Sequence, residues 1–338
     1  MKTWELQSFG LSNIRQVERA IPKPGPKEIL VKVKAVSLNF RDKAIADGIY
    51  LPEIMKMPMV PVSDTAGIVI ETGREVTRFR TGDRVISHLY SNWISGLQPP
   101  ARLSFNALGG PIDGGLTEYM ILPESGAIHT PSGLSDAEAA TLPIAALTAW
   151  FALVDHGQLK AGQTIVTQGT GGVSLFGIQL ASALGARVIA LSGSDEKLIR
   201  AKALGAAETI NYRKHPEWQQ QVLELTNGQG ADNILDVVGG SSLNRSVQAL
   251  TEGGQLSVIG FLESITANLD LLPVIFKATQ VRGILVGNRD AFEAMNKVIE
   301  KHAIRPVIDT VYSFADVHAA FAHLERGAIG KVVIQVSA

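Results

Sequence analysis

The chain carries a glycine-rich turn with the sequence Gly169-Thr170-Gly171-Gly172-Val173-Ser174. An apolar run at residues 164–167 precedes this turn, a helical pattern follows it to residue 185, and a second apolar run covers residues 187–191. Strand, turn, helix and strand in this order are typical of a βαβ unit of about thirty residues. Glycines let the backbone approach a pyrophosphate, and a helix N-terminus offers it unpaired N–H groups. The turn predicts a dinucleotide site, but Ser174 stands where the fingerprint prefers a third glycine, so a plain tight turn is the alternative.

The residues after the second apolar run predict which dinucleotide binds. Sites for NAD usually carry an acidic residue about twenty positions after the glycines, where it holds the ribose 2′-hydroxyl. Here Ser192 takes that position, Ser194 follows it, and Lys197 adds a positive charge. Hydroxyl donors and a lysine suit a 2′-phosphate, so we expect NADP(H) rather than NAD(H). Ser194 equally suits the N-cap of a helix predicted over residues 195–204. Tyr212 is a candidate neighbour of the phosphate or adenosine, or a half-buried residue at a strand end.

The composition of the chain excludes several classes of function. A length of 338 residues, of which 46% are hydrophobic, predicts two domains with sizeable cores. Lysine and arginine total 31 against 32 acidic residues, and the net charge of -1 argues against nucleic acid or an acidic membrane surface as a partner. The sequence has no cysteine, which excludes disulfides, thiolate zinc sites and cysteine nucleophiles.

The sequence carries no clear targeting or membrane signal. Its N-terminus lacks the apolar core of a signal peptide. The longest apolar stretch, residues 139–154, is short for a membrane span and contains Pro143. We interpret this stretch as a buried helix and expect a cytoplasmic protein.

The pattern of elements changes along the chain and predicts two domains. Strands are expected at residues 28–36, 65–71, 83–86 and 116–122, which is typical of a mostly β, partly open barrel. Further strands are expected at 163–167, 187–191, 208–211, 233–237, 254–259 and 280–286, with helices between most of them, which predicts a doubly wound parallel sheet. Residues 289–338 show two helical patterns and a final strand at 331–335, and we expect them to return to the first domain. The predicted limits are 1–124 with 289–338 for the barrel and 125–288 for the dinucleotide-binding domain.

Several segments, in order along nearly the whole chain, match one family. They are Asn39-Phe40-Arg41-Asp42, Asp64-Thr65-Ala66-Gly67, Thr81-Gly82-Asp83-Arg84-Val85, Gly114-Gly115-Leu116-Thr117-Glu118-Tyr119, Leu142-Pro143, Leu147-Thr148-Ala149-Trp150, the glycine turn and Gly330-Lys331-Val332-Val333. The chain thereby resembles the medium-chain dehydrogenase/reductase superfamily, and within it the zinc-free quinone oxidoreductase and alcohol dehydrogenase-like branch. The resemblance implies a GroES-like catalytic domain beside a Rossmann domain.

The resemblance also gives a test for zinc. In the zinc-dependent relatives a cysteine stands where this chain has Asn39, and a histidine stands where it has Ser63. Neither asparagine nor serine is a usual catalytic zinc ligand. The 7 histidines of the chain show no short ligand spacing. We therefore expect hydride transfer without a bound metal.

Candidate site residues follow from the resemblance and from the ends of the predicted strands. The resemblance places Asn39 near the nicotinamide ribose and Thr148 near the nicotinamide, while a turn-forming asparagine and a buried helix hydroxyl are the alternatives. The carboxyl ends of parallel strands line the cofactor crevice. The residues expected there are Val238, Gly239, Gly260 and Phe261, with Gly287 and Asn288 near the nicotinamide or the substrate.

Tyr50 is the candidate proton donor. Related reductases keep a tyrosine at the substrate cleft, where a phenol can donate a hydrogen bond or a proton to a developing enolate. An aromatic cleft wall is the alternative, and Arg41 and Asp42 are candidates for an ion pair shaping that wall. Nothing in the sequence suggests a raised pKa for Asp42.

These observations together predict the reaction class. We expect an NADPH-dependent reductase that transfers hydride to a quinone or an α,β-unsaturated carbonyl, without zinc. The alternatives are a zinc-free alcohol or aldehyde oxidoreductase, and an NADPH-binding protein without catalysis. The resemblance further implies a homodimer, in which the edge strand at 280–286 pairs with its copy.

Overall fold

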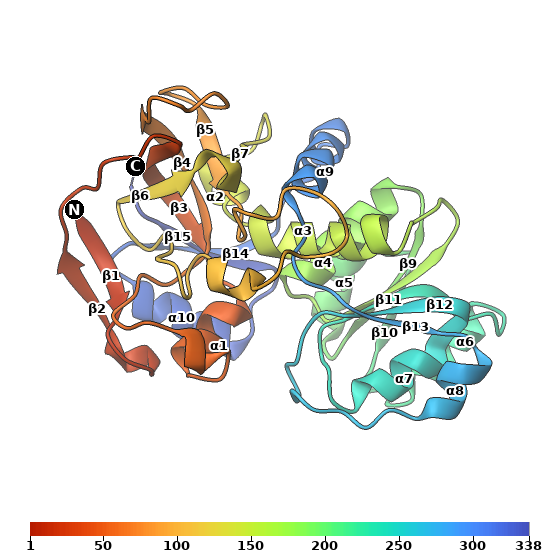
Figure 1. The fold of residues 1–338 in the computed structure, drawn as a ribbon. Coiled ribbons are helices and arrows are strands. Elements are labelled where there is room, and N and C mark those ends of the chain that lie inside the picture. Colours follow the sequence, from red (N-terminus) through yellow and green to blue (C-terminus); the bar gives the residue numbers. More distant parts are fainter. Residues whose placement is uncertain (338) are drawn as a thin grey trace. The chain divides into compact units, whose positions relative to one another are not determined.

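The computed structural model describes residues 1–337 and divides into two units. The first unit combines Met1–Leu147 with the chain from Gly287 onward, and the second is Thr148–Val286 (Figure 1). The first limit lies beyond the predicted boundary at residue 124. The reason is that strand β7 (Ala127–His129) pairs with β5 (Arg84–Ser87), and helix α2 (Asp136–Ala139) contacts strands of the first unit.

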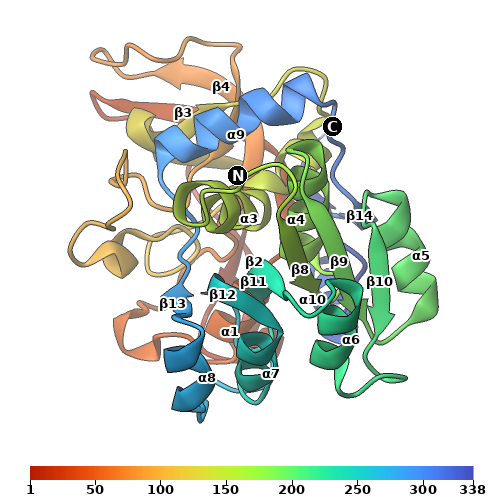
Figure 2. The same ribbon diagram turned by 90° about the vertical axis from the view of Figure 1, so that its right-hand side faces the viewer.

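The second unit is built on a parallel sheet of six strands in the order β10-β9-β8-β11-β12-β13. Figure 2 shows this sheet from β13 at one edge to β10 at the other. Its strands are β8 (Thr164–Gln168), β9 (Arg187–Ser192), β10 (Glu208–Asn211), β11 (Ala231–Asp236), β12 (Leu250–Val258) and β13 (Gln280–Gly283). The connecting helices are α4 (Gly172–Ala183), α5 (Asp195–Ala203), α6 (Trp218–Leu225), α7 (Ser242–Ala249) and α8 (Leu271–Phe276).

The side chains of alternate residues bury the two faces of this sheet. Val166 and Ile234 are fully buried in a cluster with Val222 of α6 and Val247 of α7. Because side chains alternate along a strand, Leu235 lies on the opposite face. There α4 packs closely, since a side chain at its Gly177 would meet Leu235 Cδ1 at 2.6 Å.

The first unit contains a sheet in the order β14-β15-β3-β4-β5-β7, in which β6 also pairs with β3. Its strands not yet given are β3 (Glu28–Ser37), β4 (Asp64–Thr72), β6 (Tyr119–Pro123), β14 (Ile308–Ser313) and β15 (Lys331–Gln335). A separate antiparallel pair joins β1 (Lys2–Leu6) to β2 (Ile14–Glu18). The helices are α1 (Phe40–Ala46), α9 (Arg289–Lys301) and α10 (Val317–Arg326). The two units confirm the predicted fold class.

Three local predictions differ from the structure. The strand expected at 280–286 ends at Gly283, and β1, β2, β7 and β14 were not predicted. Strand β14 alternates between half-buried and exposed residues, so no buried apolar face marks it in the sequence. The helix expected at 139–154 is broken into α2 and α3 (Leu147–Trp150), with π-helical turns at Leu142–Ala146 and Phe151–His156. Pro143 lacks the N–H that a regular helical ladder needs there. Within residues 1–337, no helix is both long and apolar enough to cross a membrane.

Candidate functional site

The glycine turn leaves open space for a ligand at the carboxyl end of β8. Gly169 has a φ of +76°, which favours glycine, and its N–H donates to Leu191 O at 2.7 Å. A side chain added at Gly169 or Gly171 would meet no heavy atom within 4 Å. Gly172 and Val173 open α4, whose first N–H groups have no acceptor inside the helix. Open space before free N–H groups fits a pyrophosphate.

Ser174 keeps its place in the turn through a hydrogen bond. Its Oγ donates to Gln168 O at 2.6 Å, so the side chain bonds to the end of β8. The close approach of helix to strand, which the third glycine of the fingerprint usually permits, occurs one turn later at Gly177. The serine is therefore compatible with a dinucleotide turn.

A buried carboxylate shapes the loops after β11 and β12. Asp236 Oδ1 accepts the N–H groups of Val238 and Gly239 at 3.0 and 2.9 Å. Its Oδ2 accepts Gln168 Nε2 at 3.0 Å, and also the hydroxyls of Ser242 and Ser246. The carbonyl of the same residue accepts Gly260 N. One residue thus ties the turn after β8 to the loops that carry Val238, Gly239, Gly260 and Phe261.

The end of β9 carries hydroxyls and cations beside a glycine. Ser192 Oγ accepts Ser194 N at 3.3 Å, and Ser194 Oγ caps α5 by accepting Lys197 N at 3.4 Å. A side chain at Gly193 would come within 2.9 Å of Tyr212 Oη and Arg213 Nε. The structure therefore places Tyr212 near Gly193 and adds Arg213, which the sequence analysis missed; a contact of Tyr212 with a ligand stays a prediction.

Two acidic residues, Asp195 and Glu196, lie in the first turn of α5 beside this rim, and Asp195 is paired. Its carboxylate accepts Lys214 Nζ at 2.6 Å and Asn211 Nδ2 at 2.7 Å. These hydrogen bonds lower the pKa of Asp195, so it stays ionised but is held by its own cation. The Asp195 carboxylate is therefore already engaged by Lys214 and Asn211.

For three more candidate residues, the structure shows burial or hydrogen bonds within the protein. Thr148 is buried in α3, with 3% of its surface exposed. Gly287 O contacts His88 Nε2 at 3.0 Å. The Asn288 side chain caps α9 by accepting Ala291 N at 2.8 Å, and its amide donates to Gly96 O at 3.0 Å. Contacts of these three with a ligand stay a prediction.

A buried polar cluster lies where β3 leads into α1. Asn39 is 8% exposed, Asp64 is fully buried and Lys331 is 3% exposed. Lys331 Nζ donates to Asn39 Oδ1 at 2.5 Å and to Leu38 O at 2.7 Å, and it lies 4.0 Å from Asp64 Oδ2. Burial lowers the pKa of Lys331 and raises that of Asp64, while the attraction between the two charges opposes both shifts. Sequence analysis gave Lys331 no role, because nothing local marks it as buried.

The structure differs from the sequence-based expectation for Asp42 in two properties, its ion pairing and its pKa. It forms no ion pair with Arg41 within the described chain, and instead its Oδ2 accepts the Asn39 N–H at 2.7 Å. Burial and the charge of Asp64 raise the pKa of Asp42 to about 6. A short acidic side chain on the first turn of a helix gave no sign of this burial in the sequence.

Tyr50 lies just beyond α1 beside a cation. The Arg41 guanidinium carbon is 5.4 Å from the centre of the Tyr50 ring. The same guanidinium donates to Leu108 O at 3.1 Å and to Gly110 O at 2.6 Å. These two hydrogen bonds anchor the Arg41 side chain to the loop of residues 106–114. Burial, together with the neighbouring Tyr50, raises the pKa of Tyr90 to about 12. The half-buried Tyr50 thus lies in a group of aromatic and cationic side chains.

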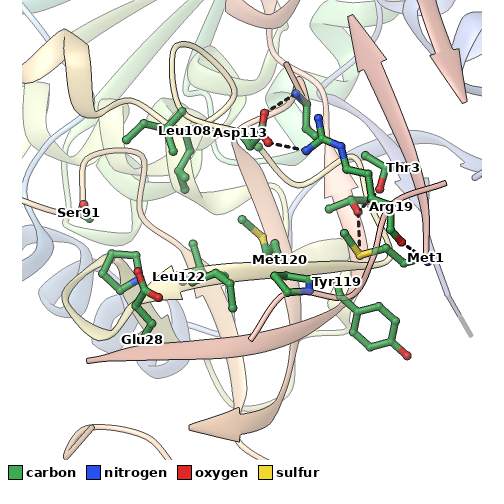
Figure 3. A pocket seen from close by; sticks show the side chains of 18 of the residues that line it. Met1, Thr3, Arg19, Glu28, Ser91, Leu108, Asp113, Tyr119, Met120 and Leu122 are labelled. Atoms are coloured by element: carbon green, nitrogen blue, oxygen red, sulfur yellow. Dashed lines mark hydrogen bonds and ion pairs between the residues drawn. The ribbon is translucent and has the colours of Figure 1, made fainter. Parts of the chain in front are cut away.

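The first unit also contains a cavity of about 500 Å³, whose lining includes Leu108 and His88. It is lined by the N-terminal strand, β6 and the 106–114 loop, and in Figure 3 Arg19 reaches across to Asp113 at 2.7 Å. None of the predicted site residues lines this cavity. Its size alone therefore does not make it the reaction site.

Comparisons with known proteins agree with the fold. Residues 25–132 match the family described as "Alcohol dehydrogenase GroES-like domain", and residues 172–301 match "Zinc-binding dehydrogenase". The chain is 40% identical to a "zinc-type alcohol dehydrogenase-like protein" of Schizosaccharomyces pombe, over 97% of this chain and 96% of that protein. It is 32% identical to a "2-methylene-furan-3-one reductase" of Solanum lycopersicum, over 99% and 79% of the two chains. A putative alcohol dehydrogenase from Sinorhizobium meliloti 1021 has a similar structure, with a TM-score of 0.93 and 44% identity over 99% and 98% of the chains.

The second family description implies zinc, and the residues at the corresponding place do not suit it. Within residues 1–337, no three His, Cys, Asp or Glu side chains are arranged to hold a metal ion. Asn39 and Asp64 face the Lys331 ammonium, and the Ser63 hydroxyl donates to Asp64 Oδ1. An amide, a hydroxyl and a carboxylate beside a buried cation are a poor set for zinc.

Proposed function

The chain belongs to the medium-chain dehydrogenase/reductase superfamily of dinucleotide-dependent oxidoreductases, and we propose that it reduces quinones or α,β-unsaturated carbonyls with NADPH and without zinc. The observation that carries this proposal is the donor set around Asn39, which lacks thiolate and imidazole ligands and contains the Lys331 ammonium. Oxidation of an alcohol would need a base for the hydroxyl proton where no metal lowers its pKa. Reduction of an activated double bond has no such need.

The preference for NADPH is supported by the rim at the end of β9. A 2′-phosphate carries negative charge and needs donors, which Ser192, Ser194 and Tyr212 supply with their hydroxyls and Lys197 and Arg213 with positive charge. The acid that would hold a 2′-hydroxyl in an NAD site is replaced by Ser192. Asp195 is held by Lys214 and Asn211, so it does not balance this charge.

With an enone, the proposed reaction adds a hydride to the far carbon of the double bond and a proton to the carbon next to the carbonyl, and with a quinone the proton ends on an oxygen of the hydroquinone. When bound, the reduced nicotinamide supplies the hydride. We assign the proton to the Tyr50 phenol, and the Arg41 guanidinium beside the ring stabilises the charge that remains on the oxygen. Asn39 is proposed to hold the nicotinamide ribose through its amide. Solvent then returns a proton to Tyr50.

The first experiment measures NADPH consumption with a 1,4-quinone, an enone and a simple aldehyde, with and without a metal chelator. We expect turnover of the quinone or the enone that the chelator does not change, and a slower reaction with NADH. Turnover that the chelator abolishes would contradict the zinc-free proposal. Turnover of the aldehyde alone supports the alcohol dehydrogenase alternative, and NADPH binding without any turnover supports a non-catalytic role.

Replacing Tyr50 tests the assignment of the proton. Tyr50→Phe removes the hydroxyl and keeps the ring over Arg41, so we expect kcat to fall by roughly 100-fold, the lower range for general acid catalysis, with little change in KM. Tyr119→Phe on β6 is the matched control and should keep the kcat of the natural protein. Equal kcat values for the two variants would assign Tyr50 to the cleft wall instead.

A homodimer is part of the proposal. Strand β13 bonds to β12 on one side only, so its outer backbone groups are open to a second copy. Next to it, α8 exposes Leu271, Leu272, Ile275 and Phe276, each more than 60% accessible. An open strand edge beside an apolar surface supports pairing between copies.

A further inference from the structure

An aspartate, a histidine and a tyrosine lie in a row at the edge of the sheet in the first unit, where α10 packs against β14. Tyr312 Oη lies 3.1 Å from His323 Nδ1, and His323 Nε2 lies 3.2 Å from Asp309 Oδ2. Tyr312 and Asp309 belong to β14, and His323 belongs to α10. None of the three is a candidate for dinucleotide or substrate binding. This Asp–His–Tyr cluster therefore needs an explanation of its own.

An irregularity in β14 brings Asp309 and Tyr312 to the same histidine. Side chains three positions apart on a regular strand point to opposite faces. In the pairing of β14 with β15, however, the register shifts between Ile308 and Thr310, so Asp309 is an extra residue. Such a bulge redirects a side chain, and bulges are over-represented next to active sites. The bulge thus allows both side chains to meet His323.

The chemistry of the three groups decides which of them donates. An ionised carboxylate only accepts, so Asp309 favours the neutral form of His323 that carries its hydrogen on Nε2. In this form Nδ1 is an acceptor, and the Tyr312 hydroxyl donates to it. Asp309 Oδ2 also accepts Ile329 N at 2.9 Å, which holds the carboxylate in place. The free lone pair of His323 therefore faces the proton of the phenol.

A hydroxyl, a base within hydrogen-bond reach and a third group that orients the base are the parts of an activated nucleophile. The imidazole can take the phenol proton while the oxygen attacks an electrophile, and the carboxylate stabilises the imidazolium that forms. The side chains of His323 and Asp309 are 18% and 30% exposed, and Tyr312 is half-buried. The cluster is thus partly shielded from water and still borders the solvent.

We propose that Tyr312 is a nucleophilic phenol that accepts an acyl group from an activated ester or thioester. The phenol oxygen forms a bond to the acyl carbon, and the phenol proton passes to His323. The bond from the acyl carbon to the leaving group breaks, and its electron pair goes to the leaving group. The leaving group or the solvent then takes the proton from His323. This transfer needs no dinucleotide, so the inference is independent of the proposed reduction.

The probe for this reaction is p-nitrophenyl acetate, and peptide mass spectrometry at short times gives the acetylation rate of each tyrosine in the natural protein. Exposure alone predicts that Tyr212, which is 42% exposed, reacts before the half-buried Tyr312. We expect Tyr312 instead to react at least about tenfold faster than Tyr212. Hydroxylamine should remove the acetyl group, because it cleaves a phenyl ester but not a lysine amide. An equal or slower rate at Tyr312 overturns the proposal.

Two variants separate activation by the cluster from simple access of the reagent. His323→Phe keeps a ring beside Tyr312 and removes the base, while Asp309→Asn keeps the size of the side chain and removes its charge. We expect acetylation of Tyr312 to fall at least about tenfold in each variant, with the rate at Tyr212 unchanged. An unchanged Tyr312 rate in the folded variants overturns the role of the histidine and the aspartate.

Two further measurements keep the test decisive. The ratio of the Tyr312 and Tyr212 rates in the natural protein needs no variant, so it decides the proposal even if a variant does not fold. Tyr312→Phe should abolish the fast acetylation and leave NADPH consumption with the quinone or the enone unchanged. Loss of the fast acetylation in this variant supports the assignment, and its persistence overturns it. Absence of any reductase activity would refute only the proposed reaction.

Discussion

At the scale of single residues, burial decides charge states that composition does not reveal. Asp42 and His88 are both fully buried, and their pKa values move in opposite directions, to about 6 and about 4. Burial disfavours the charged form in each case, which is the anion for one residue and the cation for the other. Their effects on the pH dependence of stability therefore oppose each other. Comparing a variant of each residue with the natural protein separates the two effects on stability.

His88→Gln tests this effect for the histidine. In the folded chain burial lowers the pKa of His88 from 6.5 to about 4, so below pH 6.5 the unfolded chain takes up a proton that the folded chain refuses. This contribution to stability is complete above the unfolded pKa and is lost as the pH falls toward 4. We expect the unfolding free energy of the natural protein, relative to the variant, to fall by about 3 kcal/mol across this range. Urea unfolding at several pH values measures it, and parallel curves would contradict it.

At the scale of elements, two glycines of the βαβ unit have different surroundings and therefore different roles. Gly171 faces open space at the start of α4, whereas Gly177 faces the buried side chain of Leu235. The second therefore serves packing of the helix on the sheet, whereas the first leaves the space that we propose a ligand fills. The glycine pattern in the sequence does not distinguish the two positions, because the difference depends on which atoms face each glycine in the folded chain.

A pair of alanine variants separates the two tasks. In Gly177→Ala the new methyl group would lie 2.6 Å from Leu235 Cδ1, and we expect a loss of about 1–3 kcal/mol in unfolding free energy. Gly171→Ala meets no atom, so we expect a loss below about 1 kcal/mol, as for a changed N-cap, but much weaker NADPH binding. Urea unfolding of the ligand-free protein and titration with NADPH measure the two effects. Equal destabilisation in both variants would refute the division.

At the scale of the whole molecule, the sheet of the second unit ends at β13, beside the exposed apolar residues of α8. Strand β13 and helix α8 present apolar side chains next to unpaired backbone groups. Such an edge invites pairing with another chain. The proposed assembly therefore belongs to this unit, and its test is independent of the chemistry proposed for Tyr50.

Val281→Asp combined with Phe276→Glu tests this assembly. Val281 lies in β13 with 44% exposure, and Phe276 ends α8 with 81% exposure. Carboxylates facing their copies would repel each other and lose apolar contact, so we expect light scattering to give a dimer for the natural protein and a monomer for the double variant. Ile199→Asp on α5, at 73% exposure, is the control and should leave the mass unchanged. A dimer in both variants places the interface elsewhere.

The sequence by itself determined the features that repeat over short distances. The glycine turn between two apolar runs, the alternation of strands and helices after residue 137, and the hydroxyls after β9 are local patterns, and the structure has a matching element for each. Strand β14 and the broken helix at 136–156 were less predictable, because a polar alternation and a proline within an apolar run weaken the local signal.

The tertiary structure alone decided the contacts between distant residues. Lys331 meets Asn39 because β15 pairs with β3 in one register, and Arg213 meets Gly193 because β10 pairs with β9. The side chain of Asn288 caps α9. The sequence analysis did not predict this cap, because it treated Asn288 only as a residue that follows a strand. Side-chain periodicity is fixed by backbone geometry within a few residues. Which residue becomes the partner of a buried charge is decided only when the strands of the sheet have paired.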